Sequence, residues 1–154
     1  MSIRTALSDI SFMKTLFAAA EAVAHELGDP EMGAEHLVIA ALEHDDLDRS
    51  ALAALPLDAS RFRSAVVAVH AEALSTVGLT GTVLPITGPP RGVLRSTASA
   101  QIVFQDARRS ARTQRAPLSA LHIVTAAARI DHGTTARALA RLGIERATLE
   151  NLAR

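Results

Sequence analysis

The sequence contains no cysteine, no tryptophan and no tyrosine, and its single lysine is Lys14. Without cysteine the chain forms no disulfide bond and no thiolate metal site, so it needs no oxidising compartment. No uninterrupted apolar run approaches the roughly 20 residues that a membrane-spanning helix requires. The first residues also lack the apolar core of a signal peptide. We therefore expect a cytoplasmic protein with no membrane partner.

Alanine, leucine and arginine dominate the composition, and all three favour helices. The strong preference for arginine over lysine is typical of a GC-rich genome and gives the chain an actinobacterial type of composition. The formal net charge is zero, yet residues 1–75 carry twelve acidic and five basic side chains, whereas residues 76–154 carry four and eleven. Such halves either meet within the molecule, join two copies into a homodimer or present two different binding faces.

Apolar residues recur at three- and four-residue steps over most of the chain, which predicts an all-α fold. Gly28 and Pro56 end predicted helices, and Asp58 and Ser119 stand where a capping residue begins one. The predicted helices cover about 12–27, 34–44, 47–55, 58–74, 96–113, 120–130, 135–142 and 145–153. Residues 75–95 are rich in glycine and proline and predict a linker, with a short extended piece at 82–84.

The two halves of the sequence match each other. Segment 32–38 (Met-Gly-Ala-Glu-His-Leu-Val) aligns with 118–124 (Leu-Ser-Ala-Leu-His-Ile-Val), and segment 51–58 aligns with 138–145. The offset is 86 residues in the first block and 87 in the second, a difference of one loop residue. This internal repeat predicts two four-helix units, about 11–74 and 96–154, that pack as one domain of about eight helices.

The block 33–37 (Gly-Ala-Glu-His-Leu) opens a helix, and a short Ala/Leu helix follows that ends in a Leu-Pro-Leu turn at 55–57 or a Leu-Gly-Ile turn at 142–144. This arrangement resembles the double Clp-N repeat, the N-terminal domain of the Clp AAA+ unfoldases, and most of all the ClpC type. The resemblance covers nearly the whole chain. The family motif Gly-Thr-Glu-His-(Ile/Leu)-Leu keeps its Gly, Glu and His in the first copy, and only its His and apolar residues in the second.

The resemblance implies a docking platform for adaptors and substrates of a Clp protease. The chain contains no Gly-x-x-x-x-Gly-Lys-(Ser/Thr) loop, so we expect a stand-alone recognition domain without AAA+ modules. Such a domain would act as an accessory regulator that delivers substrates, or as a decoy that sequesters ligands such as the cyclic peptides that target actinobacterial ClpC. The expected partners are Clp ATPase or protease components and their substrates.

The family also implies a site for phosphorylated arginine. A helix N-terminus suits the phosphate, and Glu35 is the candidate partner of the guanidinium group. The family carries a threonine early in the first helix of each repeat, and the second copy has Ser96 and Thr97 near that place. The first copy has Ile10 near that place instead, and the second copy has Leu121 at the position of Glu35, so neither repeat holds the full set. The alternative for Glu35 is a carboxylate that interacts only with the helix dipole.

His36 and His122 occupy matched positions and are candidate ligand-binding residues. Their alternative role is structural, as helix-start residues hydrogen-bonded to a neighbouring helix. A metal site would need converging partners at ligand spacing, and the sequence shows none, so we expect no metal.

Arg108, Arg112 and Arg115 share one predicted helical face, with Arg109 beside them. Such a face holds phosphate or an acidic partner surface, or is simply solvated. The lack of Tyr and Trp and the zero net charge argue against nucleic acid.

No nucleophile elbow or phosphate-binding loop is present. We therefore expect no enzyme and no cofactor, but a module that binds protein or peptide. The alternative is a self-associating structural protein with no Clp partner.

Overall fold

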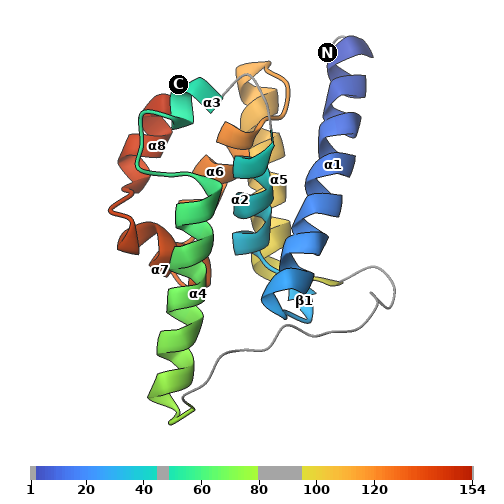
Figure 1. Ribbon diagram of the computed structural model, residues 1–154. Helices are drawn as coiled ribbons and strands as arrows, with labels where there is room; N and C mark the ends of the chain where they lie inside the picture. Colours follow the sequence, from blue (N-terminus) through green and yellow to red (C-terminus); the bar gives the residue numbers. More distant parts are fainter. Residues whose placement is uncertain (1–2, 45–48, 80–94, 154) are drawn as a thin grey trace.

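The computed structural model describes residues 3–44, 49–79 and 95–153. Within these residues the chain is almost entirely helical, as the sequence predicts (Figure 1). The helices are α1 (Ile3–Leu27), α2 (Ala34–Glu43), α3 (Arg49–Leu52), α4 (Ala59–Thr76), α5 (Ala98–Gln114), α6 (Ala120–Ala127), α7 (Thr134–Arg141) and α8 (Arg146–Leu152). The predicted extended piece at 82–84 and most of the predicted linker lie outside the described residues.

The starts of two long helices follow from their capping residues. The Asp58 carboxylate accepts a hydrogen bond from the backbone N–H of Arg61 at 2.8 Å, which confirms Asp58 as the residue that begins α4. The Thr97 hydroxyl accepts one from the N–H of Ala100 at 3.2 Å and begins α5 in the same way. A backbone N–H in the first turn of a helix has no acceptor within that helix, and each of these caps provides one.

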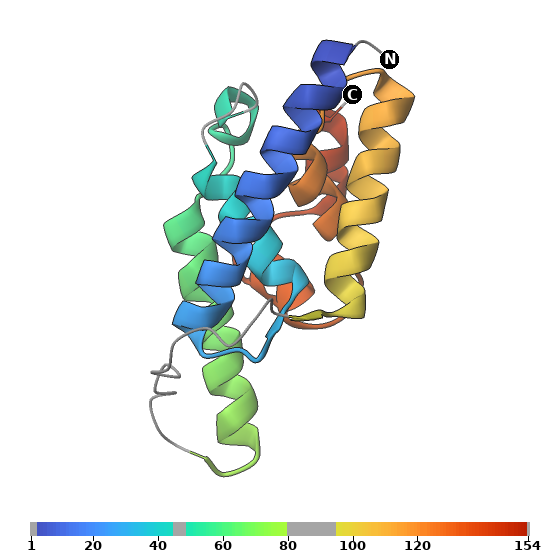
Figure 2. The same cartoon turned by 90° about the vertical axis from the view of Figure 1, so that its right-hand side faces the viewer.

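The centre of the fold is formed by α2 and α6, which pack against each other. Every residue of α6 is buried, and seven of the ten residues of α2 are buried. Helix α1 packs on α2 in the first half, and α5 packs on α6 in the second. Figure 1 shows α1 and α4 on either side of α2, and both views show the C-terminal end of α4 extending beyond the other helices (Figures 1 and 2).

The two four-helix halves are interlocked rather than stacked. Helix α7 of the second half packs on α4 and α2 of the first half, and α3 of the first half packs on α6 of the second. An ion pair between Arg141 and Glu72 also crosses between the halves. One positive and one negative side chain from the unequally charged halves thus meet within the molecule.

A two-residue parallel bridge is the one strand pairing in the described residues. It joins β1 (Glu31–Met32) to β2 (Arg95–Ser96), in the register Glu31 to Arg95 and Met32 to Ser96. The bridge continues where the N–H of Thr97 donates to the carbonyl of Met32 at 3.0 Å. It holds the entry to α2 beside the entry to α5, a contact that the sequence did not predict.

The helix bounds differ from the sequence prediction mainly at the N-terminus. Helix α1 begins at Ile3, about nine residues before the predicted start at residue 12. Helix α3 covers only Arg49–Leu52, shorter than the predicted 47–55. No helix in the described part of the chain is long and apolar enough to span a membrane. The predicted repeat boundaries stay a prediction.

Replacing Asp58 by alanine should destabilise the protein, because the N–H of Arg61 loses its acceptor. We expect a loss of about 1 kcal/mol in the free energy of unfolding, measured by chemical denaturation. Asp58→Asn is the matched control, since asparagine also caps helices. Equal losses in the two variants would contradict the capping role.

Candidate functional site

Five of the eight predicted site residues separate into two groups at opposite ends of α2, and the three arginines lie at α5. Glu35, His36, Ser96 and Thr97 lie at its N-terminal end, beside the β1–β2 bridge. His122 lies at the other end of the bundle, where it lines a groove together with His44, the residue that ends α2. The structure therefore does not combine the eight residues into one site.

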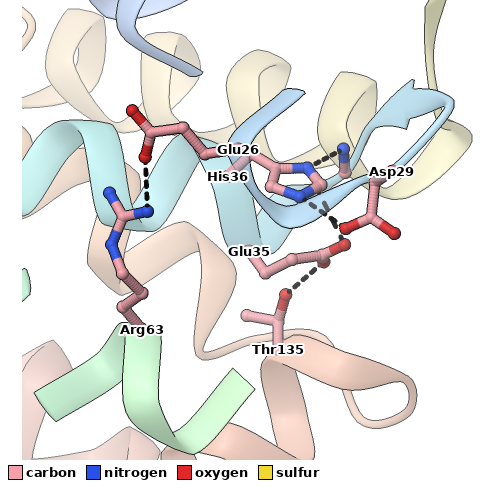
Figure 3. A network of polar contacts seen from close by, with 7 residues as sticks. Glu26, Asp29, Glu35, His36, Arg63 and Thr135 are labelled. Carbon is pink, nitrogen blue, oxygen red and sulfur yellow. Dashed lines mark hydrogen bonds and ion pairs between the residues drawn. The ribbon is translucent and has the colours of Figure 1, made fainter. Parts of the chain in front are cut away.

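Glu35 turns back over the start of its own helix. A Cβ atom on Gly33 would lie 2.2 Å from Oε1 of Glu35, so this position of the carboxylate requires a glycine at residue 33. Oε2 of Glu35 accepts a hydrogen bond from the Thr135 hydroxyl at 3.2 Å. Figure 3 shows this bond joining α2 to the start of α7 in the other half. Glu35 is therefore engaged within the molecule, and a guanidinium ligand would have to compete with Thr135.

His36 is fully buried and fastens the loop before α2. Its Nδ1 accepts the backbone N–H of Gly33 at 2.7 Å, and its Nε2 lies 2.9 Å from a carboxylate oxygen of Asp29. Because Nδ1 accepts, the ring proton must reside on Nε2, which then donates to Asp29. Both ring nitrogens are thus used, which agrees with the structural alternative for this histidine; its partner Asp29 lies in the loop just after α1.

Asp29, Glu35 and His36 bring three possible metal-ligand atoms within 4.8 Å of one another. A metal ion would need a free lone pair on the imidazole. The Nδ1 lone pair already accepts from Gly33, and Nε2 carries the proton donated to Asp29. In this structure the cluster forms a hydrogen-bonded helix start, and a metal ion would have to displace one of these hydrogen bonds.

Ser96 and Thr97 also have partners inside the protein. The Thr97 hydroxyl caps α5 and lies 2.8 Å from the Ser99 hydroxyl. The Ser96 hydroxyl accepts a hydrogen bond from the Gln101 side chain at 3.2 Å. These contacts build the entry to α5, and the β1–β2 bridge brings that entry close to Gly33 and Glu35.

His122 repeats the arrangement of His36 at the matched place in the second half. Its Nδ1 lies 2.7 Å from the Ser119 hydroxyl, and its Nε2 lies 2.9 Å from the side-chain oxygen of Gln114. Ser119 corresponds to Gly33 at the helix start, and Gln114 corresponds to Asp29 in the segment just before it. The same buried ring therefore joins a helix start to the end of the preceding helix in both repeats.

A groove of about 530 Å³ opens where the N-terminal part of α1, the α5–α6 connection and the end of α8 meet. We call it the apolar groove. Its lining contains no aspartate, glutamate, lysine or arginine among the described residues, and its large side chains are Phe12, Leu118, Leu121 and Leu152. The ring of Phe12 packs edge-on against His44, with the ring centres 4.9 Å apart. The lining residues are Ser8, Ser11, Phe12, His44, Gln114, Ala116, Pro117, Leu118, Ser119, Leu121, His122, Leu152 and Ala153.

Arg108, Arg109 and Arg112 line a shallow hollow on the surface of α5, which we call the arginine face. The guanidinium group of Arg108 lies 5.7 Å from the ring centre of Phe104, which in turn packs edge-on against Phe17. Arg115 differs from its prediction, because α5 ends at Gln114 and Arg115 adopts a left-handed backbone with φ 57°. The helical spacing that grouped Arg115 with the other two arginines therefore ends before it.

Sequence reasoning missed Asp29, Thr135 and the apolar groove. Asp29 directly follows Gly28, and Thr135 lies two residues after Gly133, a common setting that carries no specific signal. The groove combines residues more than 100 positions apart, such as Phe12 and Leu152. The one available signal was Leu121, an apolar residue at the position where the first repeat has a glutamate.

The bond between Thr135 and Glu35 should contribute to stability, because it joins a buried hydroxyl to a carboxylate. We expect Thr135→Val to lower the free energy of unfolding by about 1–2 kcal/mol in chemical denaturation.

Thr125→Val is the matched control for this substitution. Thr125 is equally buried, but its hydroxyl has no hydrogen-bond partner among the described residues. The isosteric change should therefore be neutral or stabilising. A loss at Thr125 as large as that at Thr135 would show that the bond to Glu35 contributes little.

Comparison with known proteins shows a similarity of fold. The sequence matches no protein-family model and no curated protein significantly. The structure is similar to the N-terminal domain of the caseinolytic protease associated chaperone ClpD from Arabidopsis thaliana, with a TM-score of 0.62, 19% identity, and coverage of 91% of this chain and 88% of that one. It is also similar to the Hsp104 N-terminal domain from Candida albicans, with a TM-score of 0.58, 14% identity, and coverage of 92% and 85%. The chain therefore has the fold of a Clp N-terminal domain.

Proposed function

We propose that this chain is a non-catalytic module that binds an apolar segment of a partner polypeptide in the apolar groove. The observation that carries the proposal is the lining of that groove, whose large side chains are apolar and whose polar groups are uncharged hydroxyls, an amide and two imidazoles. Its volume of about 530 Å³ lies within the usual range of ligand sites. A site of this kind binds by burying apolar surface and uses a few hydrogen bonds to fix orientation.

The divergence of the two repeats contributes to the apolar character of the groove. Leu121 lines the groove at the second residue of α6, the position that Glu35 occupies in α2. In the first repeat the carboxylate of Glu35 turns over Gly33 and bonds Thr135. In the second repeat no carboxylate stands there, so an apolar side chain from a partner meets no buried charge to desolvate.

The finer part of the proposal concerns the partner. The fold is that of N-terminal domains of Clp and Hsp104 chaperones, which supports a Clp ATPase component, an adaptor or a substrate as the binding partner. On this proposal the protein acts as an accessory regulator or as a decoy that sequesters ligands, including cyclic peptides. Binding of phosphoarginine would involve Glu35 and would require its carboxylate to leave Thr135.

The groove variant Leu121→Glu tests the proposal. A buried carboxylate should weaken the binding of apolar peptides at least about tenfold, because the peptide would have to desolvate the charge. Binding is measured by fluorescence polarisation with labelled peptides that carry a Leu-Phe-Leu core, and by capture of the host's Clp ATPase on the immobilised protein.

Because Leu121 is largely buried, a second variant separates a binding defect from a folding defect. Ser11→Arg adds bulk at the exposed mouth of the groove, and Ala18→Arg makes the same change elsewhere on α1, outside the groove lining. We expect Ser11→Arg to reduce binding and Ala18→Arg to leave it unchanged, with equal helicity by circular dichroism. If neither Leu121→Glu nor Ser11→Arg alters binding, the groove is not the binding site.

A further inference from the structure

The arginine face of α5 and the apolar groove are parts of one continuous surface. Ala116 and Leu118 line the groove and also a small cavity whose other walls include Arg108 and Arg112. Gln114 likewise lines both the groove and a hollow that contains Arg109. A polypeptide that leaves the groove along α5 would therefore pass directly over these arginines.

The positive charge of this face is poorly balanced within the described residues. Arg109 pairs with Asp106 at 3.1 Å, and its side chain is 76% exposed. No ion pair is found for Arg108 or Arg112 in that part of the chain. Asp9 shares the small cavity with both, and its Oδ1 accepts the N–H of Leu118 at 2.9 Å.

Arg129 lies at the edge of the same surface and is already part of an ion pair. It pairs with Glu150, and hydrogen bonds from Arg146 and Arg129 lower the pKa of this carboxyl group. Within the arginine face, the charge without an ion pair among the described residues therefore lies on Arg108 and Arg112. Arg108 is partly oriented by its contact with the Phe104 ring.

We propose that the ligand of the groove has two parts: an apolar stretch that enters the groove, and an adjoining run of aspartate or glutamate that lies on the arginine face. This inference rests on the proposed function and adds the chemistry of the partner. Guanidinium groups bind carboxylates through paired N–H donors, so exposed arginines beside an apolar site favour an acidic flank. A nucleic acid fits less well, because the described lining of the adjoining groove contains no lysine or arginine and residues 1–75 carry a net charge of −7.

Two labelled peptides test the inference, each with the same Leu-Phe-Leu core. One peptide carries four glutamates beside the core and the other carries four glutamines, and each is made with the flank before and after the core. We expect the better acidic peptide to bind about five- to tenfold more tightly than its glutamine counterpart at low salt. The advantage should vanish between about 0.01 M and about 1 M ionic strength, as the screening length falls from about 30 Å to about 3 Å.

A charge-matched pair of variants locates the effect. The double variant Arg108→Gln/Arg112→Gln should lose the preference for the acidic flank and still bind the glutamine peptide normally. The control Arg95→Gln/Arg137→Gln removes the same charge from exposed positions outside the groove and the arginine face, and should keep the preference. A preference that both double variants lose equally would reflect net charge alone and would overturn the inference.

The outcomes separate this inference from the proposed function. If both peptides bind equally well to the unaltered protein, the proposal of an acidic flank is wrong, and the proposal that the apolar groove binds a partner is unaffected. If neither peptide binds, the proposed function fails and the inference fails with it. If a single-stranded oligonucleotide displaces the acidic peptide at equal concentration, the arginine face serves nucleic acid, which also overturns the inference.

Discussion

The fold depends on how two buried helices satisfy the polar groups at their starts. Helices α2 and α6 pack against each other at the centre, where most of their residues are inaccessible to water. A backbone N–H left unpaired in such a place costs as much as a lost hydrogen bond. His36 accepts the backbone N–H of Gly33 and donates to Asp29. His122 occupies the matched place but contacts the side-chain hydroxyl of Ser119 and the side-chain oxygen of Gln114. In both repeats a buried histidine thus joins the start of a central helix to the end of the helix before it.

The two repeats differ at two positions near these histidines, and the residue at one position goes with the residue at the other. A glutamate at the second residue of α2 goes with a glycine just before the helix, because the carboxylate occupies the space of a Cβ atom. At the start of α6 a leucine faces the groove instead, and the preceding position carries a serine. At one end of the bundle the Glu35 carboxylate is therefore bonded within the protein. At the other end the described lining of the groove contains no carboxylate, and a partner can bring apolar side chains to it.

The sequence predicts the fold, but not the contacts between residues far apart in the chain, for physical reasons. Helical periodicity, the cap at Asp58 and the matched blocks at 32–38 and 118–124 are local signals, and they indicate the order and the duplication of the helices. The contact of Thr135 with Glu35 spans 100 residues, and no local pattern encodes it. The groove is likewise assembled from α1, the α5–α6 connection and α8. Arg115 illustrates the reverse error, since a helical spacing was extended one residue past the end of α5.

The third helix of each half, α3 or α7, packs on the other half, and this arrangement affects how the protein unfolds. Since α3 covers α6 and α7 covers α2 and α4, removing either half would expose a central helix of the other to water. We therefore expect that neither repeat folds by itself, although each is one copy of the internal sequence repeat. The domain should melt in one cooperative transition, and a gene fragment encoding a single repeat should yield an aggregating chain unless a second copy supplies the missing helices.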